Sequence, residues 1–73
     1  MSLSEAIKNT RQMALLSQED FAKELHVSVG SINRWENRKT IPNITAMRNL
    51  KIFCEAHNLP YESIQIEWIK EKE

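Results

Sequence analysis

Two short helical segments separated by a three-residue break are the feature that most constrains how this 73-residue chain folds. Ser17 stands where a helix N-cap is expected, with Asp20 three residues later as in a variant of the capping box. Ser28 takes the same position after the break. We therefore predict helices over residues 18–25 and 29–37. Isolated helices of about two turns are not stable in water, so packing must hold both.

The connection between these helices, residues 26–28, is too short for the two to lie antiparallel. They must cross at a steep angle, as in a helix-turn-helix motif over about residues 17–37, and the second helix then projects from the surface. A helix about 10–12 Å across can enter a DNA major groove about 12 Å wide. Ile32 and Trp35 lie on the inward face of the second helix. The opposite face, which is rich in hydrogen-bond donors, carries Gly30, Arg34 and Asn37.

Apolar spacing predicts three more helices, over residues 3–14, 43–57 and 61–69. The segment 61–69 also alternates like a strand, and we favour a helix. With one Gly and two Pro, the composition disfavours an all-β chain and favours one all-α domain over residues 1–69. Residues 70–73 are expected to be a charged, frayed tail. The predicted apolar row of the fourth helix comprises Ile44, Met47, Leu50 and Phe53, thickened by Ala46, Ile52 and Ala56.

Two charged residues fall on rows that should face the core. Arg11 lies in the apolar stripe of the first helix, and Glu36 lies on the inward face of the segment 29–37. A buried charge is costly without a partner, so an ion pair between the two helices would satisfy both. The alternative is that each side chain reaches solvent independently, and the sequence alone does not separate the two.

The charges sum to zero but are unevenly distributed along the chain. Residues 30–51 carry a net charge of +4, whereas residues 1–29 carry −1 and residues 52–73 carry −3. A phosphate backbone responds to this local potential rather than to the total charge. The alternative interpretation is an ordinary solvated surface.

Several classes of function are disfavoured by the composition. The single cysteine, Cys54, cannot form an internal disulfide or a cysteine-rich metal site, which fits a reducing compartment. No phosphate-binding glycine loop, metal-binding His motif or nucleophile elbow is present, so we expect no enzyme activity, no metal and no cofactor. No apolar run is long enough to span a membrane and no leader is visible, so we expect a cytoplasmic protein.

The run Leu16-Ser17-Gln18-Glu19-Asp20-Phe21-Ala22, followed by Val27-Ser28, Ile32-Asn33-Arg34-Trp35-Glu36-Asn37, Lys39 and Pro42, resembles the phage-repressor and Cro-type (XRE-like) helix-turn-helix family. The resemblance runs from about residue 3 to residue 66 and is most specific between Leu16 and Pro42. It implies a compact five-helix bundle that binds operator DNA, usually as a homodimer.

The resemblance also implies roles for single residues. Gln18 matches a glutamine that contacts phosphate and steadies the second helix of the motif. The DNA-reading positions are occupied by Ser28, Val29, Gly30 and Arg34, with Asn33 beside them. Asn37, Lys39 and Asn43 match positions that contact the DNA backbone, and Arg38 is a further residue expected to bind DNA. Arg38 stands where the family often has Gly, so a positive φ there would be strained. Arg11 and Glu36 match the family's ion pair between helices.

The sequence thus predicts a sequence-specific DNA-binding transcriptional regulator, a repressor, with the helix 29–37 in the major groove. Double-stranded DNA is the expected partner, and a homodimer is expected through the C-terminal element. Equally, the apolar residues of that element could serve only to close the core; they are Tyr61, Ile64, Ile66, Trp68 and Ile69. The alternative function is a protein-interaction module, such as an antitoxin with an autoregulatory helix-turn-helix, that binds a protein partner through the acidic C-terminal third.

Overall fold

A computed structural model describes residues 2–72, which form five helices. No strand occurs among these residues, so the all-α prediction is confirmed and the strand alternative for residues 61–69 is wrong. The helices are α1 (Leu3–Met13), α2 (Gln18–Leu25), α3 (Val29–Glu36), α4 (Ile44–Ala56) and α5 (Glu62–Lys72).

The first four helices each begin at a capping side chain. In every case an oxygen of the cap accepts a hydrogen bond from the backbone N–H three residues later, which satisfies one of the free donors at the helix start. The four caps are Ser2, Ser17, Ser28 and Asn43. The caps at Ser17 and Ser28 set the starts of α2 and α3 that the sequence predicted. The helix α3 ends at Glu36, one residue before its predicted end.

Four residues with left-handed backbone geometry follow the ends of the first four helices. They are Leu15, His26, Arg38 and Asn58, with φ between 55° and 61°. Asparagine tolerates this conformation better than most residues, so Asn58 adopts it with little strain. Arg38 does adopt the positive φ that Gly would accept without strain.

The core is built from all five helices around side chains with no exposed surface, among them Ile7, Phe21, Ile32, Leu50 and Ile64. The rings of Phe21 and Phe53 meet edge to face, with centroids 5.2 Å apart, and join α2 to α4. The helix α2 packs against α3 and α4, and α1 packs against α3 and α5. Because α2 and α3 are only eight residues long, these contacts are what hold them in place.

The last helix is fixed by two hydrogen bonds from aromatic side chains. The Tyr61 hydroxyl donates to the carbonyl of Met47 at 3.0 Å, and Trp68 Nε1 donates to the carbonyl of Pro42 at 2.7 Å. The helix runs three residues past its predicted end at residue 69, to Lys72, whose Nζ lies 4.6 Å from the centroid of the Trp68 ring. This cation–π contact stabilises the last turn of the helix, so the prediction of a frayed tail is wrong for residues 70–72. Residue 73 lies outside the described residues.

Three residues predicted for the buried row of α4 are exposed. Ile44 is 54% exposed and Ile52 is 63% exposed, and Ala56 is exposed as well. Ile52 follows the buried Leu50 by two residues, which is about 200° around a helix, so it points away from the core. Ile44 is the first residue of its helix, directly after the cap Asn43.

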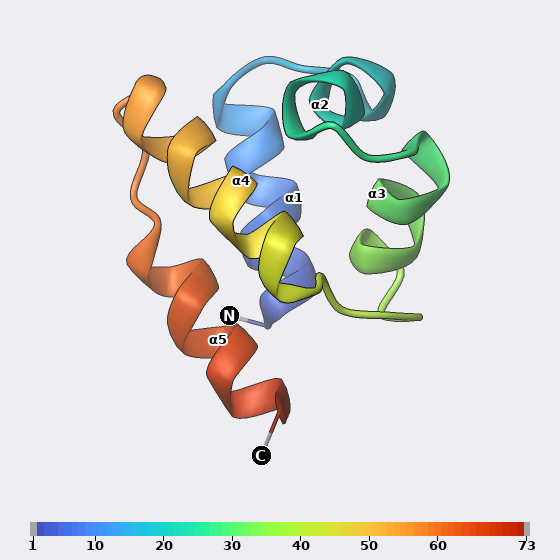
Figure 1. The fold of residues 1–73 in the computed structure, drawn as a ribbon, viewed down its shortest axis with the longest axis vertical. Coiled ribbons are helices and arrows are strands. Elements are labelled where there is room, and N and C mark those ends of the chain that lie inside the picture. The colour runs from blue at the N-terminus through green and yellow to red at the C-terminus, as the bar shows by residue number, and fades with distance from the viewer. Residues whose placement is uncertain (1, 73) are drawn as a thin grey trace.

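The arrangement in space separates two faces of the molecule. Figure 1 shows α3 on one side and α5 on the opposite side, with α4 between them. The domain measures 30 × 25 × 21 Å. Between residues 2 and 72, no helix is long and apolar enough to cross a membrane.

Candidate nucleic-acid interface

The outer face of α3 is open to solvent. Ile32 is fully buried and Trp35 is 6% exposed, so these residues fix which side of the helix faces the core. On the other side, Asn33, Arg34 and Asn37 are exposed, and Gly30 is partly exposed. The structure therefore leaves free the face that the sequence predicted to be free.

Beneath this helix lies a buried ion pair. Arg11 Nε donates to Glu36 Oε2 at 2.7 Å and Arg11 Nη2 donates to Glu36 Oε1 at 3.0 Å, a two-pronged contact. The side chains of Arg11 and Glu36 are 14% and 4% exposed. The hydrogen bond with Glu36 raises the pKa of Arg11 further. Arg11 Nη1 also donates to the carbonyl of Leu16 at 3.0 Å, so one guanidinium links α1, the turn before α2, and α3. The predicted pair is present, and neither charge reaches solvent independently.

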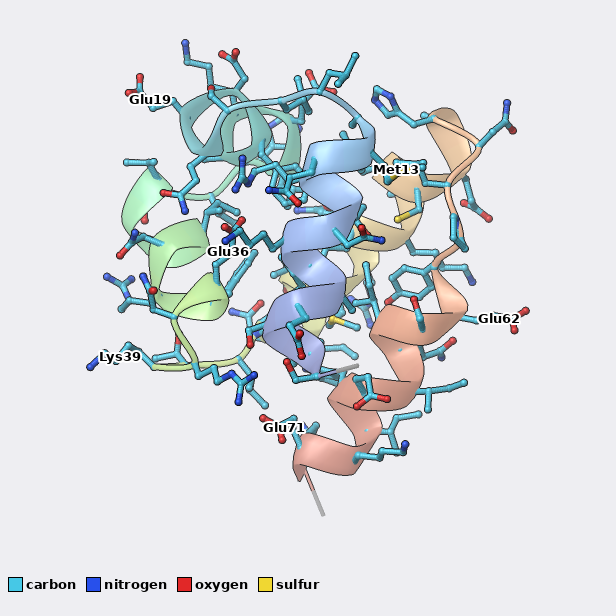
Figure 2. All side chains as sticks on the ribbon, turned by 180° about the vertical axis from the view of Figure 1, so that it is seen from behind. Met13, Glu19, Glu36, Lys39, Glu62 and Glu71 are labelled. Carbon is cyan, nitrogen blue, oxygen red and sulfur yellow. The ribbon has the colours of Figure 1, made fainter. Side chains whose placement is uncertain are left out.

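Gln18 extends this network to the surface. Its Nε2 donates to Glu36 Oε1 at 3.1 Å, and its Oε1 accepts from Asn33 Nδ2 at 3.5 Å. Figure 2 shows Glu36 between α3 and α1, behind the exposed face. The first residue of α2 is thereby hydrogen-bonded to two residues of α3. These bonds agree with the role that the resemblance implies for Gln18, which is to steady the second helix of the motif.

At the start of α3 the side chains form a short polar cluster. Ser28 Oγ accepts from the backbone N–H of Ser31 and lies 3.0 Å from Ser31 Oγ. Arg34 Nη2 in turn donates to Ser31 Oγ at 3.4 Å. Sequence reasoning did not select Ser31 as a site residue. Its spacing of three residues from both Ser28 and Arg34 was the available signal, because residues three apart are neighbours on a helix.

Three of the predicted DNA-contacting residues after Arg34 also have structural contacts. Asn37 Nδ2 donates to the carbonyl of Asn33 at 2.9 Å, and Asn43 Oδ1 caps α4 at 2.8 Å from the Ala46 nitrogen. Arg38 Nη2 lies 3.6 Å from Glu5 Oε1 and 3.3 Å from Ser2 Oγ, which ties the loop after α3 to the first turn of α1.

The electrostatics of this region follow from which charges are covered. Glu36 is the only acidic residue between residues 30 and 51, and Arg11 neutralises it in the interior. The exposed charges of this segment are all positive: Arg34, Arg38, Lys39, Arg48 and Lys51. Figure 2 shows Lys39 at the outer edge of the loop that follows α3. The basic segment predicted from the sequence is thus exposed to solvent as cations, with Arg34 on the outer face of α3 and Arg38 and Lys39 in the loop that follows it.

Two short helices joined by a tight turn, with the second helix presenting a polar, cationic face, define a helix-turn-helix DNA-binding domain. Comparison with known families agrees, because residues 7–60 match the family described as helix-turn-helix. The chain belongs to the XRE-type helix-turn-helix family. No curated protein and no solved structure gives a significant match. The protein is therefore a DNA-binding regulator, and DNA is its partner.

Proposed function

We propose that the protein is a sequence-specific transcriptional repressor that places α3 in the major groove of operator DNA. The observation that carries this proposal is the uncovered face of α3, where Arg34 stands exposed among polar neighbours. Repression is the simplest regulatory outcome for such a domain, since occupying a promoter is enough to block it.

In this proposal, Arg34 reads a base directly. A guanidinium can donate two parallel hydrogen bonds to the O6 and N7 atoms of guanine, the commonest specific contact in the major groove. Val29, which is 44% exposed, can contact a thymine methyl group, and Ser28 and Asn33 supply further polar contacts. Contacts to the DNA backbone come from Gln18, Asn37, Arg38, Lys39 and Asn43.

The proposal includes a homodimer formed through α5. The longest dimension of one molecule is 30 Å, whereas paired half-sites lie about 34–36 Å apart, so one copy covers one half-site. On α5, Ile66 and Ile69 are 50% and 47% exposed and lie three residues apart, so they are neighbours on the helix. In Figure 1, α3 and α5 lie on different sides of α4, and Ile66 and Ile69 are not part of the exposed face of α3, so pairing through these two residues leaves that face uncovered in both copies.

The experiment is a selection of bound duplexes from a random pool, followed by titration of the best duplex and a scrambled duplex at several salt concentrations. We expect a two-fold-symmetric consensus containing a guanine in each half, with the best duplex bound at least about 10³-fold more tightly than the scrambled one. Enrichment of no consensus would overturn the proposal.

Size exclusion with light scattering, with and without DNA, separates this function from its alternative. A protein that ignores duplex DNA at low salt but forms a tight complex with another protein would instead be an interaction module such as an antitoxin. A repressor should elute as a dimer without DNA, and its mass should rise when duplex DNA is added.

A further inference from the structure

We infer that Gly30 is a positioning residue for Arg34: its missing side chain creates the space in which the guanidinium lies, and so determines which base pair Arg34 reads. This inference rests on the proposed function and adds a specificity-determining residue that contacts no base itself.

The geometry of α3 places the two residues on one face. Gly30 and Arg34 are four residues apart, and side chains in a helix lean toward its N-terminus, so Arg34 extends over Gly30. A β-carbon added to Gly30 would stand 3.3 Å from Arg34 Nη1, closer than ordinary van der Waals contact. The other nitrogen, Nη2, lies 3.4 Å from Ser31 Oγ. The guanidinium thus lies over the first turn of α3, next to the position that a side chain on Gly30 would take and within hydrogen-bond distance of the Ser31 hydroxyl.

Backbone conformation does not account for this glycine. Gly30 has no positive φ, whereas the four residues that do are Leu15, His26, Arg38 and Asn58. Glycine also disfavours helix relative to alanine, so Gly30 costs stability where it stands. The remaining physical effect of Gly30 is the space above it. Besides Arg34, the nearest atom to an added β-carbon would be Ser28 Oγ at 3.8 Å, an ordinary van der Waals contact, so the rest of the fold leaves room for a β-carbon.

The space matters because recognition of guanine requires a fixed guanidinium. A bidentate contact is lost when the plane of the donor tilts or its two nitrogens shift relative to the base edge. Alanine at residue 30 requires Arg34 Nη1 to move by a few tenths of an ångström. Atoms beyond the β-carbon add bulk on the same face, so we expect a larger side chain to displace the guanidinium further. A variant with a larger residue at position 30 would keep Arg34 and its charge but would hold the guanidinium in a different position.

The test is a double-mutant cycle on Gly30→Leu and Arg34→Ala, with Gly30→Ala as an intermediate step. Binding is measured to the duplex that the wild type selects and to the duplex in which the guanine assigned to Arg34 is replaced. The measured quantity is the ratio of the two affinities. We expect Gly30→Leu to lower this ratio about tenfold, Gly30→Ala to lower it less, and Gly30→Leu to change nothing further once Arg34 is alanine. Lys39→Ala is the matched control, because losing a backbone contact weakens both duplexes alike.

Thermal unfolding separates this effect from misfolding. Gly30→Ala should raise Tm while lowering selectivity, and a variant damaged in its fold would lose both. Two results would overturn the inference: an unchanged ratio in Gly30→Leu, or an equal loss with and without Arg34, which would show that Gly30 acts independently. If the wild type itself selects no duplex, the proposed function fails. If the wild type and Arg34→Ala differ but Gly30→Leu matches the wild type, only the present inference fails.

Discussion

Two exposed cations of the α3 region are expected to act on DNA in different ways. Arg34 lies on the outer face of α3, and Lys39 lies in the following loop. Arg34→Ala should cost about 1–3 kcal/mol on the best duplex and relax the preference at one base pair. Lys39→Ala should weaken binding to every duplex and reduce the slope of log affinity against log salt by about one. Titrations of matched and mismatched duplexes at several salt concentrations measure both effects. Equal behaviour of the two variants would contradict the assignment of Arg34 as the reading residue.

The buried ion pair makes a second prediction at the scale of single residues. Arg11→Met removes the partner of a carboxylate that is 4% exposed, so the free energy of unfolding should fall by about 3–5 kcal/mol. The double variant Arg11→Met with Glu36→Leu removes the unpaired charge as well and should recover most of the loss. Urea unfolding of the two variants decides this. If the double variant is no more stable than Arg11→Met, then the charge of Glu36 is not the source of the cost.

Cys54 gives the protein a dependence on alkaline pH. Its side chain is fully buried, and burial raises the pKa of the thiol from 9.0 to about 11. The folded state therefore favours the neutral thiol. Its contribution to the free energy of unfolding is fully present below pH 9 and is lost as pH rises through about 11. We expect the free energy of unfolding to fall by up to about 2 kcal/mol across this range. The pKa of Tyr61 is also raised by burial, so urea unfolding should be compared in a Tyr61→Phe background. Adding Cys54→Ala to that background should flatten the profile, and a slope unchanged by Cys54→Ala would contradict the prediction.

At the residue scale, helical periodicity predicts which face of a helix a residue occupies. It places Arg11 and Glu36 on inward rows and Arg34 opposite Ile32, whereas the pairing of Arg11 with Glu36 and the reading role of Arg34 follow from the family resemblance. The bonds of Gln18 to Glu36 and of Ser31 to Arg34 were not predicted, because side-chain torsions depend on neighbours brought together only by folding.

At the scale of helices, the strained turn between α1 and α2 can be improved. Leu15 has a φ of 60° and is 92% exposed, so the packing of its side chain does little to offset the backbone strain. Leu15→Gly should raise the free energy of unfolding by about 0.5–1 kcal/mol, the relief of left-handed strain less the added freedom of the unfolded chain. Asn58→Gly is the control, because asparagine already tolerates this conformation, and it should change stability by less than Leu15→Gly does. A destabilised Leu15→Gly protein in urea unfolding would show that the side chain makes contacts that matter.

Helix starts were easier to predict than helix ends. Ser17, Ser28 and Asn43 announce α2, α3 and α4 because a cap needs a particular side chain at one position. In many proteins a glycine in the left-handed conformation marks the end of a helix. Here that conformation is adopted by Leu15, His26 and Arg38, which are not recognisable as helix ends from the sequence. The end of α5 was missed for a related reason, since the contact of Lys72 with Trp68 is a tertiary detail that a charged tail does not reveal.

At the scale of the whole molecule, the arrangement of the helices came from the family resemblance more than from the residues. Periodicity predicts helices and their inward faces, but not which helix packs against which. The contact of α1 with α5 joins the two ends of the described chain, and no local signal encodes a pairing at that separation. The exposed isoleucines of α5 and the exposed face of α3 belong to different helices, so the proposed association and DNA recognition would use different surfaces (Figure 1).

The proposed dimer through α5 can be tested at its two exposed isoleucines. Ile66→Glu with Ile69→Glu places charges on a surface that the dimer would bury, so the variant should be a monomer in light scattering at concentrations where the wild type is a dimer. The variant should bind a single half-site with wild-type affinity, because α3 is untouched, and should lose the cooperative gain on the paired site. Ile52→Glu is the matched control, since it makes the same change at an isoleucine of α4 that is 63% exposed. A dimer that survives both changes on α5, or one that dissociates on Ile52→Glu, would place the association surface elsewhere on the domain.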